Sequence, residues 1–196
     1  MGLFVKKGNH KLPRTTAIFN LPHLVTCPGA TAECKSYCYA RKSERQYKQC
    51  LPYRYANWEA SKRDDFAANA IGELKRMRTK NAVRIHESGD FYNQAYVNKW
   101  VEIVKACPEY LFTFYTKSFH LFDFSKLRAC KNVVAFASVD PTTPKERLEK
   151  AKGWAKATVL QEGKIARKGY FLCTGSCKSC KHCYQLGAGN VAFRKH

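Results

Sequence analysis

Seven of the ten cysteines gather in two short segments, and this clustering constrains the chain more than any other feature. The second segment contains Cys173, Cys177, Cys180 and Cys183, and its last three cysteines have the spacing C-x2-C-x2-C. Bacterial-type ferredoxins wrap one cubane iron–sulfur cluster with this spacing, and Cys173 is a candidate fourth ligand. Zinc is the competing metal because it also binds four cysteines, although zinc ribbons usually present two separated pairs. Unmetallated thiols or a redox disulfide are the remaining alternatives.

The first segment holds Cys27, Cys34 and Cys38 in one loop with proline and glycine, directly after the first predicted strand. Three thiolates leave one iron of a cubane without a ligand from this loop. That iron is open to a substrate, a cofactor or a remote cysteine. A structural zinc site and ordinary buried thiols are the alternatives.

The cellular compartment decides between metal ligands and disulfides. The N-terminal segment lacks a continuous hydrophobic stretch, so no secretory signal is predicted. No apolar run approaches the roughly 20 residues that cross a bilayer, so we expect no membrane partner. A cytoplasmic protein is therefore expected, where clustered cysteines bind metal or do redox chemistry. The isolated cysteines are expected to be small buried side chains: Cys50, Cys107 and Cys130.

Positive charge is the main compositional bias. The chain has 35 Lys and Arg against 15 Asp and Glu, a formal net charge of +20. Such a charge favours anionic partners, nucleic acid above all, although no recognition motif accompanies it. A solvated basic surface is the alternative.

Short apolar runs alternate with helical stretches, which is typical of a parallel sheet covered by helices. Strands are expected at 15–21, 82–85, 111–115, 133–139, 157–160 and, as a sixth, 169–172. Helices are expected at about 55–78, 96–104 and 125–129, and a further one after Thr143 as N-cap and Pro144 as first residue. Five or six strand–helix units predict an α/β fold, as a partial (β/α) barrel over 1–168 or an open sheet. Residues 169–196 form a cysteine-rich metal-binding extension packed on the same domain.

Polar residues follow the predicted strand ends, where parallel α/β folds place their chemistry. The candidate cofactor pocket comprises Glu87, Ser88, Gly89, Asp90 and Lys117. Several alternatives remain open. Asp90 caps the next helix and Glu87 pairs with a surface lysine, or Lys117 is solvated instead of meeting an anionic small-molecule ligand.

The loop cysteines resemble those of the radical S-adenosylmethionine superfamily, in which three cysteines after the first strand of a partial barrel hold a cluster. An aromatic residue commonly precedes the last cysteine there, as Tyr37 precedes Cys38. The usual spacing in that superfamily is C-x3-C-x2-C, whereas this chain has C-x6-C-x3-C. The resemblance implies a 4Fe-4S cluster and S-adenosylmethionine as a cofactor, near Glu87 and Gly89 after the second strand.

A closer resemblance is to phage proteins of the gene-product-88 type. It rests on the Cys-Pro-Gly loop ending in Cys-Tyr-Ala, on Ser88–Phe91, on Tyr115–Lys117 and on the C-terminal cysteines, and it spans about residue 15 to the end. It implies a phage origin, a host cytoplasm and an iron–sulfur protein, with one or two clusters. Whether the chain is a radical-type or electron-transfer enzyme stays open. The second hypothesis is a metal-stapled basic protein that binds nucleic acid or a host factor.

Overall fold

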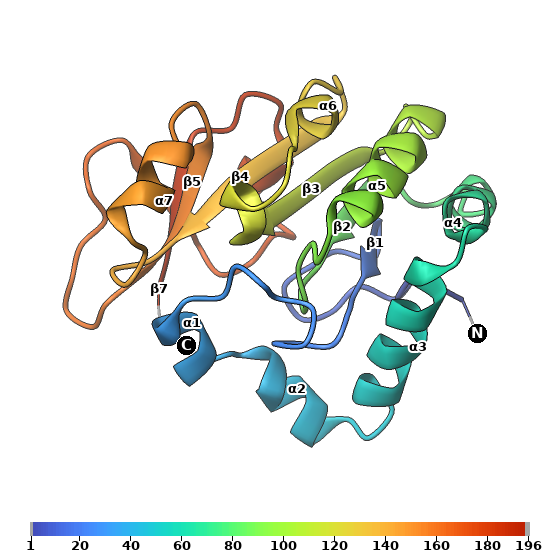
Figure 1. Ribbon diagram of the computed structural model, residues 1–196, viewed down its shortest axis with the longest axis horizontal. Coiled ribbons are helices and arrows are strands. Elements are labelled where there is room, and N and C mark those ends of the chain that lie inside the picture. The colour runs from blue at the N-terminus through green and yellow to red at the C-terminus, as the bar shows by residue number, and fades with distance from the viewer. Residues whose placement is uncertain (1, 195–196) are drawn as a thin grey trace.

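Seven strands, all parallel, form one sheet in the computed structural model, which describes residues 2–194 (Figure 1). The strand order is β1-β2-β3-β4-β5-β7-β6, and the sheet does not close on itself. The strands are β1 (Thr16–Phe19), β2 (Ala82–Ile85), β3 (Leu111–Thr116), β4 (Val133–Val139), β5 (Ala155–Leu160), β6 (Tyr170–Leu172) and β7 (Asn190–Arg194).

Helices connect the first five strands, which lie next to one another in sequence order. Right-handed crossovers between such strands put every connection on the same face of the sheet. Figure 1 shows α5 and α6 in front of β3 and β4. The helices are α1 (Ala32–Ser36), α2 (Ala40–Gln46), α3 (Cys50–Lys62), α4 (Phe66–Lys75), α5 (Gln94–Ala106), α6 (Ser125–Arg128) and α7 (Lys145–Lys150), with 3-10 turns η1 (Ser118–His120) and η2 (His182–Tyr184).

The main core lies between the sheet and α4, α5 and α6. Side chains alternate between the two faces of a strand, so Phe112 and Phe114 of β3 enter this core. Trp100 of α5 is fully buried and meets the ring of Phe19 edge-on at 5.4 Å between centroids. Phe19 and its neighbours thereby fix the carboxyl end of β1 against the helical layer.

The opposite face of the sheet carries a smaller apolar group and is covered by the C-terminal segment. Its buried members are Val134, Phe136, Ala157 and Val191, and Cys173 and Cys183 pack against them. The C-terminal cysteines lie on this face, whereas the cysteine loop after β1 lies at the carboxyl edge of the sheet.

The predicted parallel α/β architecture is confirmed, but the number of strands was wrong. Strand β7 was not predicted, and it lies between β5 and β6. The C-terminal region 169–196 therefore contributes two strands to the same sheet. The predicted helix 55–78 is two helices, α3 and α4, because the chain turns at residues 63–65. Pro144, and not Thr143, is the residue that precedes α7.

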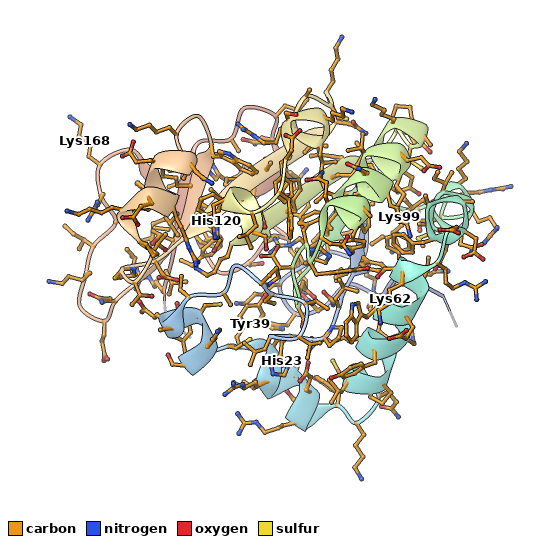
Figure 2. The ribbon with its side chains drawn as sticks, viewed as in Figure 1. His23, Tyr39, Lys62, Lys99, His120 and Lys168 are labelled. Atoms are coloured by element: carbon orange, nitrogen blue, oxygen red, sulfur yellow. The ribbon has the colours of Figure 1, made fainter. Side chains whose placement is uncertain are left out.

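Lys99 of α5 explains why α3 stops where it does. Its ammonium donates hydrogen bonds to the carbonyl oxygens of Lys62 at 3.0 Å and Arg63 at 2.6 Å, where α3 ends (Figure 2). A cation at this position satisfies carbonyls that lack a partner within the helix. This contact also fixes α3 against α5.

His86 follows β2 and is held neutral in the core. It is 3% exposed, has a positive φ of 64°, and its Nε2 lies 2.8 Å from the Tyr96 hydroxyl. Burial and, to a smaller extent, the charge of Arg84 together lower the pKa of His86 to about 3. The folded protein thus binds a proton at this site far less readily than the unfolded chain does.

We expect His86 to make the protein less stable in acid. Between the unfolded pKa of about 6.5 and the folded value, the unfolded chain binds the extra proton, so stability falls as the pH falls. This contribution changes by at most about 1.4 kcal/mol per pH unit. His86→Asn tolerates a positive φ and should show a shallower loss in urea unfolding between pH 6.5 and 4.5. Equal slopes for both proteins would contradict this account.

Candidate functional site

The loop after β1 brings Cys27, Cys34 and Cys38 together. The Cys27 amide donates to the Leu24 carbonyl at 3.0 Å, and the hydroxyl of Thr31 caps α1 by accepting from the Cys34 amide at 3.2 Å. All three thiols are partly buried, and the thiols of Cys34 and Cys38 lie near enough to raise the pKa of Cys27 electrostatically. The loop therefore brings three thiols near one another.

The surroundings of Cys27 and Cys34 favour the protonated thiols. Burial raises the pKa of Cys27 well above its ordinary value, and the nearby charge of Asp90 adds to the rise. Burial also raises the pKa of Cys34, while the charge of Lys117 opposes this rise. Because metals bind the thiolate, metal uptake here would release protons.

Asp90 organises the carboxyl ends of β2 and β3. Its Oδ1 accepts from the Thr116 hydroxyl at 2.6 Å and the Phe91 amide at 2.7 Å, and its Oδ2 accepts from the Lys117 amide at 2.9 Å and the Ser118 amide at 3.2 Å. Burial raises the pKa of Asp90 to about 6 although these hydrogen bonds oppose the rise. The carboxylate therefore accepts hydrogen bonds from several donors at this carboxyl edge of the sheet, here called the rim.

A second buried carboxylate, Asp140, ties the cysteine loop to the ends of β3 and β4. The ammonium of Lys117 and the hydroxyl of Thr31 each donate to its Oδ2 at 2.5 Å. Its Oδ1 accepts from the amide of Thr142 at 3.0 Å, within the turn after β4. Burial acts to raise the pKa of Asp140, but the bonds from Lys117 and Thr31 outweigh it and lower the pKa overall.

The loop also approaches β3 at a glycine. A Cβ atom at Gly29 would lie 2.3 Å from the carbonyl oxygen of Lys117, closer than any side chain can pack. The guanidinium of Arg147 donates to the Gly29 carbonyl at 3.2 Å and holds the loop from the other side. Gly29 is therefore required by the close contact of two backbones.

The structure contradicts the alternative roles that were predicted for Asp90, Glu87 and Lys117. Asn93, and not Asp90, caps α5 by accepting from the Tyr96 amide. Glu87 accepts from the Asn9 side chain at 2.7 Å and pairs with no lysine in the described part of the chain. Lys117 is not freely solvated, because its ammonium pairs with Asp140 and its side chain is only 13% exposed.

Ser88 and Gly89 shape the backbone at the same rim. The Ser88 hydroxyl donates to the Leu21 carbonyl at 2.9 Å, and the amides of Glu87 and Ser88 donate to the Asn20 side chain. Gly89 has a φ of 81°, and a Cβ there would lie 2.5 Å from the Cβ of Leu21. These residues join the ends of β1 and β2 and hold the start of the cysteine loop.

Tyr39 joins the loop to the same strand end. Its hydroxyl donates to the carbonyl oxygen of Glu87. Nearby, the Glu44 carboxylate accepts from Arg54 at 2.6 Å, and its other oxygen lies 2.7 Å from His23 Nδ1. Figure 2 places Tyr39 and His23 below the strands, on the side of the molecule that carries the loop. The loop is thus anchored at its beginning, middle and end.

The C-terminal cysteines lie on the face of the sheet opposite the helices. Cys173 extends β6, its amide donating to the Ala192 carbonyl at 2.8 Å, and the Cys177 amide donates to the Lys11 carbonyl at 3.0 Å. Cys173 and Cys180 act electrostatically on Cys177, and Cys173 and Cys177 act on Cys183. The four thiols are therefore neighbours, as the three loop thiols are.

All ten cysteines are free thiols in the structure. Cys107 is buried as expected, whereas Cys50 and Cys130 are only partly buried. Within residues 2–194, no three or more His, Cys, Asp or Glu side chains are placed to hold one metal ion. A single ion needs its ligands to converge on one point, whereas the thiolates of a cluster bind through different irons.

Sequence reasoning missed several residues of the site. Arg84 on β2 and Tyr184 in η2 lie beside the C-terminal thiols, and Thr31 and Asn20 hold the rim. Arg84 could have been found, because a charged residue within the apolar run Ala82–Ile85 is unusual for a buried strand. The others carry no comparable signal.

The fold and the rim define a parallel α/β protein with two cysteine-rich regions beside its sheet. None of its helices, within the described residues, combines the length and the hydropathy needed to cross a membrane. The chain belongs to the phage protein family described as Gene product 88, which matches residues 3–172. The match includes the cysteine loop and ends just before Cys173, so the C-terminal cysteines lie outside it.

Two phage proteins are similar to this chain, and both are called Gene 88 protein. The one from Mycobacterium phage L5 is 28% identical over 126 residues, which cover 59% of this chain and 53% of that protein. The one from Mycobacterium phage D29 is 26% identical over 126 residues, covering 59% and 52%. The chain thus spans about half the length of these relatives. No solved structure matches the chain.

We expect Gly29→Ala to destabilise the protein because the added methyl group collides with the Lys117 carbonyl. Overpacking of this kind costs about 1–3 kcal/mol of unfolding free energy, measured by urea unfolding. Gly189→Ala is the matched control, since a Cβ there meets nothing within 4 Å. Equal stability of the two variants would show that the loop does not depend on this contact.

Proposed function

We propose that this chain is an iron–sulfur protein that holds one or two 4Fe-4S clusters. In this proposal Cys27, Cys34 and Cys38 ligate a cluster at the rim, and Cys173, Cys177, Cys180 and Cys183 ligate a second. The observation that carries it is the loop after β1, where three free thiols are held together by contacts to the ends of β2, β3 and β4.

The chemistry of the donor set fits iron–sulfur clusters. Thiolates are the usual ligands of such clusters, and each group of cysteines here is free of disulfides. The C-x2-C-x2-C spacing of the C-terminal group adds to this fit. Zinc remains the competing metal for either group, because it also accepts four sulfur ligands.

The loop group supplies three thiolates, so one iron of its cluster would lack a cysteine from the loop. When bound, a cluster of this type supplies one-electron chemistry to a ligand on that iron. The residues around it define what such a ligand would meet: the charge of Lys117 acts on Cys34, and the charge of Asp90 acts on Cys27. We propose S-adenosylmethionine as a ligand of that iron. We also propose that the open sheet has the form of a partial barrel.

Metal analysis of anaerobically purified protein tests this proposal. We expect iron and acid-labile sulfide in equal amounts, about eight of each per chain if both clusters form. Cys34→Ser should lose about half of the iron, whereas Cys130→Ser, which changes an isolated and partly buried thiol, should lose none. A change in the electron paramagnetic resonance spectrum on adding S-adenosylmethionine would support that ligand.

The same analysis can contradict the proposal. If the protein contains zinc but no sulfide, the cysteines hold structural zinc and not iron–sulfur clusters. Folded protein without iron, sulfide or zinc would exclude both the iron–sulfur clusters and the structural zinc sites. Iron lost equally from Cys34→Ser and Cys130→Ser would show that the loop is not the binding place.

A second candidate function is binding of nucleic acid, and one structural observation favours it. Several of the few carboxylates are consumed in internal contacts, namely Glu44, Glu73, Asp90 and Asp140, all of which are buried or nearly so. These contacts also consume the buried cations Arg54 and Lys117, so the exposed surface keeps a charge close to the net +20 of the chain. A surface of this kind attracts phosphate groups.

For this second function we expect retention of a DNA or RNA duplex on filters at low salt. Affinity should fall steeply and linearly on a plot of log K against log salt, because bound lysines and arginines release counterions. A protein of equal net charge but unrelated fold serves as the control for nonspecific attraction. Absence of binding at low salt would exclude this function.

A further inference from the structure

Arg84 and Tyr115 place a cation and a ring on the face of the sheet that the C-terminal segment covers. Arg84 is paired in register with Thr113, so both side chains point to this face, and Tyr115 follows two residues later on the same side. The Arg84 guanidinium lies 4.1 Å from the centre of the Tyr115 ring, and its Nε donates to the His86 carbonyl at 3.1 Å. Arg84 is thereby fixed in position by the sheet itself.

The Arg84 charge has no carboxylate partner in the described part of the chain. The ion pairs there involve other cations, and Glu87 acts on Arg84 only at a distance. Arginine carries five N–H donors and stays charged in proteins. Cations in protein interiors are usually paired with an anion. The unpaired Arg84 guanidinium on this covered face of the sheet therefore indicates a site where an anion binds.

The hydroxyl groups next to Arg84 either lack a hydrogen-bond acceptor or are hydrogen-bonded to a cysteine sulfur. The Tyr115 hydroxyl is hydrogen-bonded to Cys183. Tyr184 lies in η2, which packs on β3, and its buried hydroxyl has no partner within residues 2–194. The Thr113 hydroxyl is buried and unpartnered in the same way.

The C-terminal thiols are within the electrostatic reach of this group. Burial raises the pKa of Cys183 to about 11, and both the Tyr115 hydroxyl and the Arg84 charge oppose that rise. Arg84 opposes the rise at Cys177 as well. Cys173 and Cys183 pack with Tyr115 against the same small apolar group. The polar donors and the thiols thus belong to one site.

We propose that Arg84, Tyr115 and Tyr184 are positioning residues that donate hydrogen bonds to the sulfur atoms of an iron–sulfur cluster held by the C-terminal thiolates. This inference rests on the proposed function and goes beyond it by naming the side chains that surround one cluster without ligating it. A cluster with four thiolates is an anion, which is the partner that Arg84 lacks. Positive charge and hydrogen bonds to sulfur raise the reduction potential of such a cluster.

The two sites consequently differ in how easily they accept an electron. The loop thiols lie near Asp90 and Asp140, with Lys117 as the opposing charge. The C-terminal thiols lie near an unpaired arginine and two tyrosine hydroxyls. The C-terminal cluster is therefore the one with the higher reduction potential.

The test uses the full-length triple variant Cys27→Ser, Cys34→Ser, Cys38→Ser, which leaves the C-terminal cluster as the one signal. Its reduction potential is measured by dithionite titration followed by electron paramagnetic resonance. Tyr184→Phe should shift the potential to a more negative value, and Arg84→Met should shift it further. Arg84→Lys, which keeps the charge, should recover part of the shift. Tyr47→Phe, at an exposed tyrosine away from both sites, should leave the potential unchanged.

The outcomes separate this inference from the function on which it rests. A triple variant that folds without iron or sulfide overturns the assignment of a C-terminal cluster, and the inference falls with it. Iron and sulfide present with an unchanged potential in Tyr184→Phe and Arg84→Met overturns the inference alone. If the triple variant does not fold, the same substitutions in the wild-type protein decide, because only one of two cluster signals should move.

Discussion

All seven strands run in the same direction, so every strand ends at the same edge of the sheet. That edge collects backbone amides and polar side chains that have no partner within the sheet. Asp90 meets this requirement at the end of β3, where its two oxygens accept from backbone and hydroxyl donors. Asp140 does the same at the end of β4 and reaches the cysteine loop through Thr31. The position of the three loop thiols follows from these two carboxylates.

Most of the sheet could be predicted because its strands are continuous apolar runs. The segments 82–85 and 133–139 were predicted to the residue, because Val83, Ile85 and the valines and Phe136 of 133–139 favour strands. Strand β7 escaped prediction because Asn190–Arg194 has polar ends and follows a glycine-rich and cysteine-rich stretch. The break between α3 and α4 depends on Lys99, a residue far along the chain, and no local pattern reveals it.

The candidate site could be predicted in its residues but not in its partners. The strand-end position of Asp90 and Lys117 follows from the parallel arrangement. That Lys117 pairs with Asp140 depends on the packing of two strand ends, which the sequence does not encode locally. For Arg84, the sequence contained a usable signal, since an arginine in a buried strand must find a partner. That partner could be proposed only because the structure places the C-terminal segment on the same face of the sheet as Arg84.

The insertion of β7 between β5 and β6 has a consequence for the order in which the molecule assembles. Strand β6 emerges from the ribosome before β7, yet its neighbour in the sheet is β7 and not β5. The cysteine-rich stretch between these two strands must therefore wait, unattached at its far end, until β7 is synthesised and docks. The four C-terminal thiols are therefore brought to their final positions only when β7 joins the sheet.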